Sequence, residues 1–127
     1  MEPQALAMDV RQLEKLSVLQ DEQAPNLVAE MAQGFLARTP ARLARLRECL
    51  LEGNAGRLAN EAHGLATSSG MFGMMRVRLL CKSLENLVRG SGLEGAEALI
   101  LQVERAFTEA RPLLLAQLQC PEAQSPE

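Results

Sequence analysis

The sequence predicts an all-α protein: an antiparallel up-down four-helix bundle with a short extra helix at its N-terminal end. Hydrophobic residues make up 47% of the 127 residues, which is enough to build a core. Alanine and leucine, which favour helix, are prominent among them. Aromatic residues make up only 2%, and β-branched residues are scarce, so few side chains prefer a pleated sheet. Apolar residues also recur at three- and four-residue steps, as they do on one face of a helix.

The first helices follow from their boundary residues. Residues 1–8 look like a flexible lead-in, and Asp9 can cap a short helix. A second helix is expected over residues 25–38. It should end there because Thr39 precedes a proline, and a residue before proline disfavours the helical conformation. Thr39 would then be the N-cap of a third helix.

Tight turns connect the middle helices. The third helix should cover residues 39–53, with Gly53 as the residue that ends it. Asn54 can cap the next helix at once, so a fourth helix is expected over residues 55–70. Connections this short make neighbouring helices antiparallel.

The last two helices complete the predicted domain. A fifth helix is expected over residues 74–89 and a sixth over residues 93–119, with a kink or break at Pro112. Residues 120–127 look like a disordered tail. The bundle domain would therefore span residues 9–119.

Charge and cysteine content exclude several classes of function. The net charge of −3 implies no general nucleic-acid role. The three cysteines are odd in number and far apart, so a disulfide framework or a metal site is not expected. No apolar run is long enough to span a membrane, and the first residues do not resemble a signal peptide, so a cytoplasmic protein is expected. A basic cluster is either a solvated helix face or a docking patch for an acidic protein: Arg38, Arg42, Arg45, Arg47 and Arg57.

His63 is the only histidine in the chain and lies in the fourth predicted helix. At 3.6 residues per turn it points about 200° away from the inward-facing Leu65, so it should project into solvent. A neutral imidazole is available near pH 7 and can attack phosphorus. Its neighbours on that face are mostly small and would let a partner approach: Ala59, Asn60, Ala66, Thr67 and Gly70.

Spacing alone leaves a simpler interpretation open. A lone exposed histidine in a helical domain is more often incidental than functional. No Asp, Glu, Ser or Cys stands at a spacing that would make a self-contained catalytic site with it. Asn60, one turn upstream, would either orient the ring by a hydrogen bond or be an ordinary solvated residue.

Two motifs carry a resemblance to a known family. "HGLATSSGMFG" at residues 63–73 is similar to the pattern H-x-L-K-G-S-[SA]-x-x-[LF]-G, and "VRLLCKSLE" at residues 77–85 is similar to L-x-x-L-C-x-x-L-E. Both patterns belong to the histidine-containing phosphotransfer (HPt) domains of multistep two-component signalling. The resemblance covers residues 9–118.

The resemblance implies a function and a set of partners. His63 would receive a phosphoryl group from an aspartate of a response-regulator receiver domain, or of a hybrid histidine kinase, and pass it to another receiver. Such domains have no kinase activity of their own, so the protein would not be an enzyme. It would need no cofactor, because Mg²⁺ is expected on the partner receiver.

Two residues depart from the family pattern and keep alternatives open. Ala66 replaces the usual lysine and Thr67 replaces the usual glycine. Arg78 and Lys82 of the next helix should lie near the level of His63 and would replace the missing charge, unless they are ordinary solvated residues. One alternative is an HPt-like interaction module that is never phosphorylated and that modulates a receiver or a kinase. A plain structural or dimerisation bundle is a third interpretation.

Overall fold

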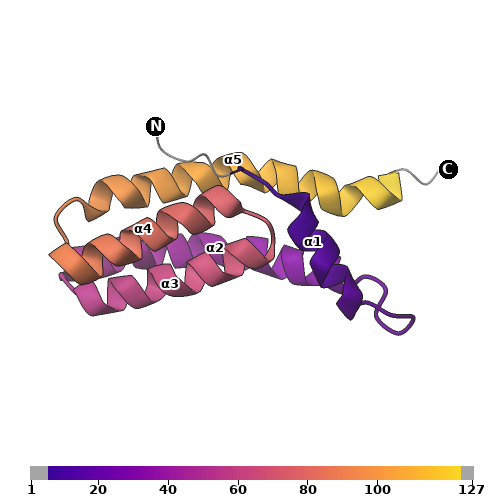
Figure 1. Cartoon of the computed structure of the whole chain (residues 1–127), viewed down its shortest axis with the longest axis horizontal. Coiled ribbons are helices and arrows are strands. Elements are labelled where there is room, and N and C mark those ends of the chain that lie inside the picture. The colour runs from indigo at the N-terminus through magenta and orange to yellow at the C-terminus, as the bar shows by residue number, and fades with distance from the viewer. Residues whose placement is uncertain (1–5, 124–127) are drawn as a thin grey trace.

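The computed structural model describes residues 6–123, and within that range every regular element is a helix. Figure 1 shows the long helices side by side, with a short helix across them. The elements in chain order are α1 (Val10–Leu16), the 3₁₀ turn η1 (Ser17–Leu19), α2 (Leu27–Glu52), α3 (Ala55–Met71), α4 (Met75–Ser91) and α5 (Ala96–Ala123).

The four long helices form one bundle, as the sequence predicts. Contacts join α2 to α3, α3 to α4, α4 to α5 and α5 back to α2, with the most extensive packing between α3 and α4. The short α1 lies across the end of the bundle where α3 turns into α4 (Figure 1). The predicted all-α four-helix bundle with an extra N-terminal helix is confirmed.

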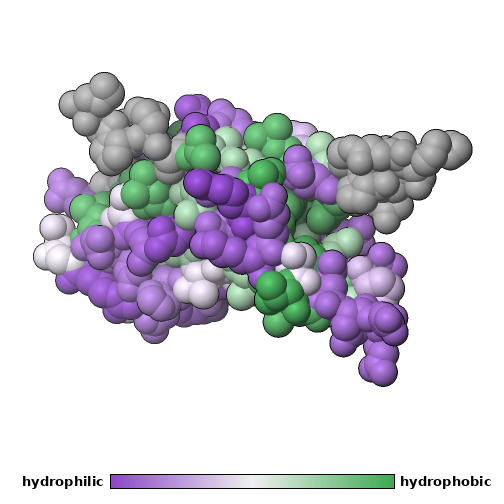
Figure 2. Space-filling view, turned by 45° about the vertical axis from the view of Figure 1, so that its right-hand side comes forward, coloured by the Kyte–Doolittle hydropathy of each residue, from purple (hydrophilic) through white to green (hydrophobic). Residues whose placement is uncertain are grey.

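One apolar core runs through the bundle. Phe35 of α2 stacks on Phe72 at a ring separation of 5.0 Å and meets the edge of Phe107 at 6.4 Å. Leu65 is buried, as its inward-facing position predicts, and the core around it includes Leu58, Ala62, Val77, Cys81, Leu84, Val88, Val103, Phe107 and Leu114. On the face shown in Figure 2, hydrophilic residues cover much of the area and hydrophobic residues form separate small groups.

Helix α2 corrects one prediction. The chain does not break between residues 25–38 and 39–53, and Pro40 lies inside a single helix of 26 residues. Thr39 is not an N-cap: it is buried, and its hydroxyl donates to the Phe35 carbonyl at 2.6 Å. Buried side chains on both sides of Pro40 pack into the same core, and this packing offsets the roughly 3 kcal/mol that an interior proline costs.

Helix α5 is also longer than predicted. It begins at Ala96 instead of residue 93, continues through Pro112 and ends at Ala123. Leu114 is fully buried and neighbouring leucines are partly buried, so packing continues beyond the proline. Residues 120–123 are therefore helical and do not belong to the tail expected over residues 120–127. Residues 124–127 lie outside the described part of the chain, as do residues 1–5 of the expected lead-in.

The segment before α1 is fixed to the turn between α3 and α4. The Asp9 amide donates to the Gly73 carbonyl at 2.7 Å, and the Arg76 amide donates to the Leu6 carbonyl at 3.0 Å. Gly73 has φ +84°, and a Cβ atom there would lie 2.5 Å from the Asp9 carbonyl oxygen, so only glycine allows this approach. Residues 6–8 are therefore held in place, although a flexible lead-in over residues 1–8 was expected.

The predicted caps of α1 and α3 are confirmed. The Asp9 carboxylate accepts from the Arg11 amide at 3.1 Å, and the Asn54 side chain accepts from the Arg57 amide at 3.0 Å. Gly53 ends α2 in the left-handed region with φ +72°, as expected. The short connections at residues 53–54 and 72–74 place α3 antiparallel to α2 and to α4.

Candidate functional site

His63 lies near the middle of α3 and faces solvent. Its side chain is 62% exposed, whereas Leu65, two residues later, is fully buried. This is the orientation that the helical period predicts. The Thr67 hydroxyl, one turn later, donates to the His63 backbone carbonyl at 3.2 Å. The imidazole is therefore open to another protein, while the helix beneath it is anchored in the core.

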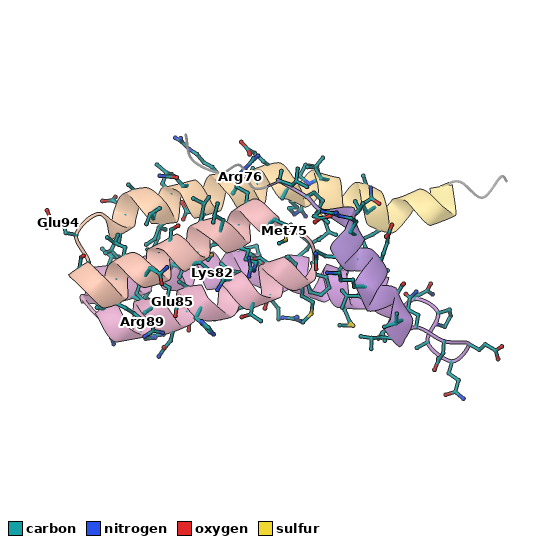
Figure 3. The ribbon with its side chains drawn as sticks, viewed as in Figure 1. Met75, Arg76, Lys82, Glu85, Arg89 and Glu94 are labelled. Carbon is teal, nitrogen blue, oxygen red and sulfur yellow. The ribbon has the colours of Figure 1, made fainter. Side chains whose placement is uncertain are left out.

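A carboxylate from α4 holds one nitrogen of the ring. His63 Nδ1 lies 3.2 Å from Glu85 Oε1. Arg89 Nε donates to the other oxygen of Glu85 at 2.9 Å, and an Arg89 terminal nitrogen donates to Asn60 Oδ1 at 3.2 Å. Figure 3 shows Lys82, Glu85 and Arg89 in order along α4. A chain of polar contacts thus runs from Asn60 through Arg89 and Glu85 to the histidine.

The charge on Glu85 determines which nitrogen of His63 is free. Partial burial of Glu85 opposes its ionisation, but hydrogen bonds from Arg89 and His63 outweigh that effect and hold the pKa of the carboxyl below its usual value. The group is therefore a carboxylate near neutral pH and can only accept at Nδ1. In the neutral imidazole, Nδ1 therefore carries the proton, and the lone pair of Nε2 is directed away from Glu85.

A groove opens beside the ring. It has a volume of about 480 Å³ and is bounded by His63, by residues of α3 and α4, and by Gln12 of α1. The remaining lining residues are Ala66, Thr67, Gly70, Met71, Met75, Arg78 and Lys82. Two methionines give part of this surface an adaptable apolar character.

The structure brings both expected cations to this groove. Arg78 is half-buried and its aliphatic stem lies against Gly70, where a Cβ atom would be 2.7 Å from Arg78 Cδ. Lys82 is exposed, one helical turn further along α4. Among the side chains of residues 6–118, no carboxylate lies within ion-pair distance of either side chain.

Two of the small residues expected on the exposed face are buried. Ala59 has no exposed surface and Ala66 is 3% exposed. Both face the α4 side, where their small side chains let α3 and α4 approach closely. Ala66 still lines the bottom of the groove, whereas Ala59 does not. Asn60 is exposed but contacts Arg89, so no contact with the imidazole is present at that residue.

Sequence reasoning missed Glu85 as the partner of His63. The signal was present, because the short turn at residues 71–73 places residues near 81 at the level of the histidine, and Glu85 follows one turn later. Counting residues away from the turn along both helices identifies Glu85 as a neighbour of His63, whereas a search for carboxylates in the histidine's own helix does not.

Other chemistry is not supported by the described residues. Among the described side chains, those of residues 6–118, there is no group of three or more His, Cys, Asp or Glu that could hold a metal ion. Burial raises the pKa of the Cys81 thiol to about 12 and also raises that of Cys49, so both remain protonated and are poor nucleophiles. None of the described helices has the length and apolar character needed to cross a membrane.

Comparison with known proteins agrees with this geometry. The Hpt domain family model matches residues 30–113, which include His63 and Glu85. The histidine-containing phosphotransfer protein B (HptB) of Pseudomonas aeruginosa PAO1 has a similar structure, with a TM-score of 0.79 and 29% sequence identity. That match covers 91% of this chain and 97% of HptB. No curated protein sequence matches the chain.

Two plant structures share the fold at lower identity. A protein of the histidine-containing phosphotransfer type from rice has a TM-score of 0.76 and 22% identity, over 89% of this chain and 80% of its own. MtHPt2 of Medicago truncatula, a histidine-containing phosphotransfer protein, has a TM-score of 0.75 and 22% identity, over 95% and 85% of the two chains.

Proposed function

Because the chain belongs to the Hpt domain family, we propose that it is a phosphorelay carrier in which Nε2 of His63 accepts and returns a phosphoryl group. The observation that carries this proposal is the contact between Nδ1 and Glu85, which leaves Nε2 free on an exposed ring. The donor and acceptor would be aspartates of response-regulator receiver domains or of hybrid histidine kinases. The cytoplasmic location expected from the composition is part of the proposal.

The transfer step can be written with all its bonds. The lone pair of Nε2 attacks phosphorus in line, the new N–P bond forms, and the bond to the aspartyl oxygen breaks. The aspartate leaves as a carboxylate. Nδ1 keeps its proton, so the phosphorylated ring is an imidazolium, and the neighbouring Glu85 carboxylate balances its positive charge. The reverse sequence returns the phosphoryl group to a second aspartate.

Docking would use the groove beside the ring. Thr67, Gly70 and the two methionines are uncharged, and Gly70 has no side chain, so a receiver can approach the imidazole. Mg²⁺ and the acidic pocket would come from that partner, and this chain would contribute no cofactor. No complete catalytic site is formed by its described side chains, so we propose a carrier without kinase activity of its own.

The test is transfer from a panel of phosphorylated receivers and hybrid kinases to the wild-type protein and to His63→Gln. An acid-labile label on the wild type and none on the variant is the expected result. His63 is the only histidine in the sequence, so the variant removes every alternative imidazole. Receiver binding that survives in both proteins without any label would refute the carrier function and favour the unphosphorylated interaction module.

A further inference from the structure

We infer that Arg78, which lies against Gly70, is the cation that stabilises the phosphoryl group on His63. This inference rests on the proposed function of His63 and assigns a residue to the charge that the phosphorylated form requires. A phosphoryl group adds up to about two negative charges at neutral pH and three strong acceptor oxygens. These would enter the groove, because its lining includes the histidine itself.

The arginines near the groove differ in whether they are free to bind. Arg45, Arg76 and Arg89 each have a carboxylate partner, at 3.4, 3.0 and 2.9 Å respectively. Within the described side chains of residues 6–118, Arg78 has no such partner, and the groove contains none of those three paired arginines. Its guanidinium therefore has no competing anion before the phosphoryl group arrives.

Gly70 explains how Arg78 reaches this place. The site of a Cβ atom on Gly70 would be 2.7 Å from Arg78 Cδ and 3.1 Å from Arg78 Nε. The stem of the arginine therefore crosses α3 where any other residue would push it away. Gly70 is one turn beyond Ala66 and lies within about 20° of His63 around the helix axis. The glycine thus gives an arginine of α4 access to the face that carries the imidazole.

Lys82 is a weaker candidate for the same role. Its ammonium is on a flexible, exposed side chain, and no contact holds it in the groove. An arginine presents a planar set of donors that matches the oxygens of a phosphoryl group, whereas a lysine acts as a point charge. We therefore assign the main contact to Arg78, with Lys82 adding to the local field.

Arg42 provides a matched control on the other side of α3. It lies against Gly64, where a Cβ atom would be 2.7 Å from its guanidinium, and it donates to Ser68 Oγ at 3.0 Å. It is an unpaired arginine among the described residues, as Arg78 is, but it does not line the groove. Its removal changes the net charge equally without changing the groove.

The experiment loads the isolated protein with phosphoramidate and needs no receiver. In the loading step the P–N bond of phosphoramidate breaks, ammonia leaves, and the bond from Nε2 to phosphorus forms. The half-life of the phosphohistidine is then followed by intact mass at constant pH. Gly70 lies roughly 10 Å along the helix axis from His63, and for a charge at about that separation in an exposed site Arg78→Gln should shorten the half-life about twofold. Arg78→Lys should restore part of the loss, and added salt should reduce the difference.

A double-mutant cycle tests the geometry, because Gly70→Ala itself changes no charge. Gly70→Ala should shorten the half-life when Arg78 is present and have no effect in an Arg78→Gln background. Arg42→Gln, which removes a charge outside the groove, should shorten the half-life less than Arg78→Gln does. An unchanged half-life in Arg78→Gln, or an equal loss in Arg42→Gln, would overturn the inference. Failure of receivers to label His63, with loading by phosphoramidate intact, would instead refute the proposed function alone.

Discussion

Glu85→Gln is the substitution that most directly examines how the site works. The amide keeps the shape of the side chain and an oxygen that can accept from Nδ1 of His63, but it removes the negative charge. The present contact is 3.2 Å long, between a carboxylate that is 15% exposed and a ring that is 62% exposed. Transfer should therefore remain possible but lose the charge that balances the phosphorylated imidazolium.

The magnitude follows from the exposure of the pair. A hydrogen bond to a charged group is worth about 1.5–3 kcal/mol, and the exposed ring places this one near or below the lower limit. A loss of about 1–1.5 kcal/mol corresponds to a rate of phosphoryl acceptance roughly 5- to 10-fold slower. The assay is single-turnover transfer from a saturating phosphorylated receiver, with thermal unfolding of each variant measured in parallel.

Arg89→Gln is the matched control, because it removes the support of Glu85 but leaves the carboxylate in place. It should slow transfer less than Glu85→Gln does.

The pH dependence follows from Glu85. The pKa of this carboxyl is lowered in the fold, so the contribution of its charge to transfer is present above the usual glutamate pKa and is lost as pH falls through the lower folded value. The ionisation of Glu85 should therefore cause no change in the ratio of wild-type to Glu85→Gln rates from pH 6 to 8. Equal rates for Glu85→Gln and the wild type would refute this account of the site.

Three further predictions concern the fold. Gly73→Ala should reduce the free energy of unfolding in urea by at least about 2 kcal/mol, because residue 73 has a positive φ and a Cβ atom there would clash with Asp9. Gly90→Ala is the control: a Cβ atom there would meet open space, so the free energy of unfolding should rise by about 0.5–1 kcal/mol. Pro40→Ala should raise it by about 1–3 kcal/mol, since an amide becomes available inside α2, and a loss would contradict the account of that helix. Cys81 should resist thiol reagents at pH 8 until the protein unfolds, as peptide mapping would show, and rapid labelling of the folded protein would contradict its burial.

Local signals in the sequence predicted the elements whose boundaries depend on local chemistry. Asp9 and Asn54 cap helices because their side chains reach amides two or three residues away, and such contacts need no knowledge of the rest of the fold. Pro40 misled the prediction because its cost is local, whereas the packing that outweighs it comes from α3 and α5. Long-range burial of Phe35 and Leu46, on either side of the proline, determines that α2 is continuous.

In the candidate site, too, features set within one helix could be predicted from the sequence, whereas contacts between helices could not. The exposure of His63 follows from the helical period, which is a property of one helix. Glu85 stands 22 positions later, and its contact depends on the register between two helices. The burial of Ala59 has the same origin, because it depends on how closely α4 packs. Residues on one helix could be assigned from sequence, but contacts across the hairpin needed its three-dimensional pairing.

The attachment of both ends of the α3–α4 hairpin has a consequence for how a signal would leave this protein. At one end Asp9 holds Gly73, and at the other Arg89 joins Asn60 to Glu85. No described segment next to the ring is loosely attached in a way that would let it rearrange on loading. The loaded and empty forms should therefore share one shape and differ only in their electric field. A partner would then distinguish the two messages by charge, and that distinction would fade as ionic strength rises.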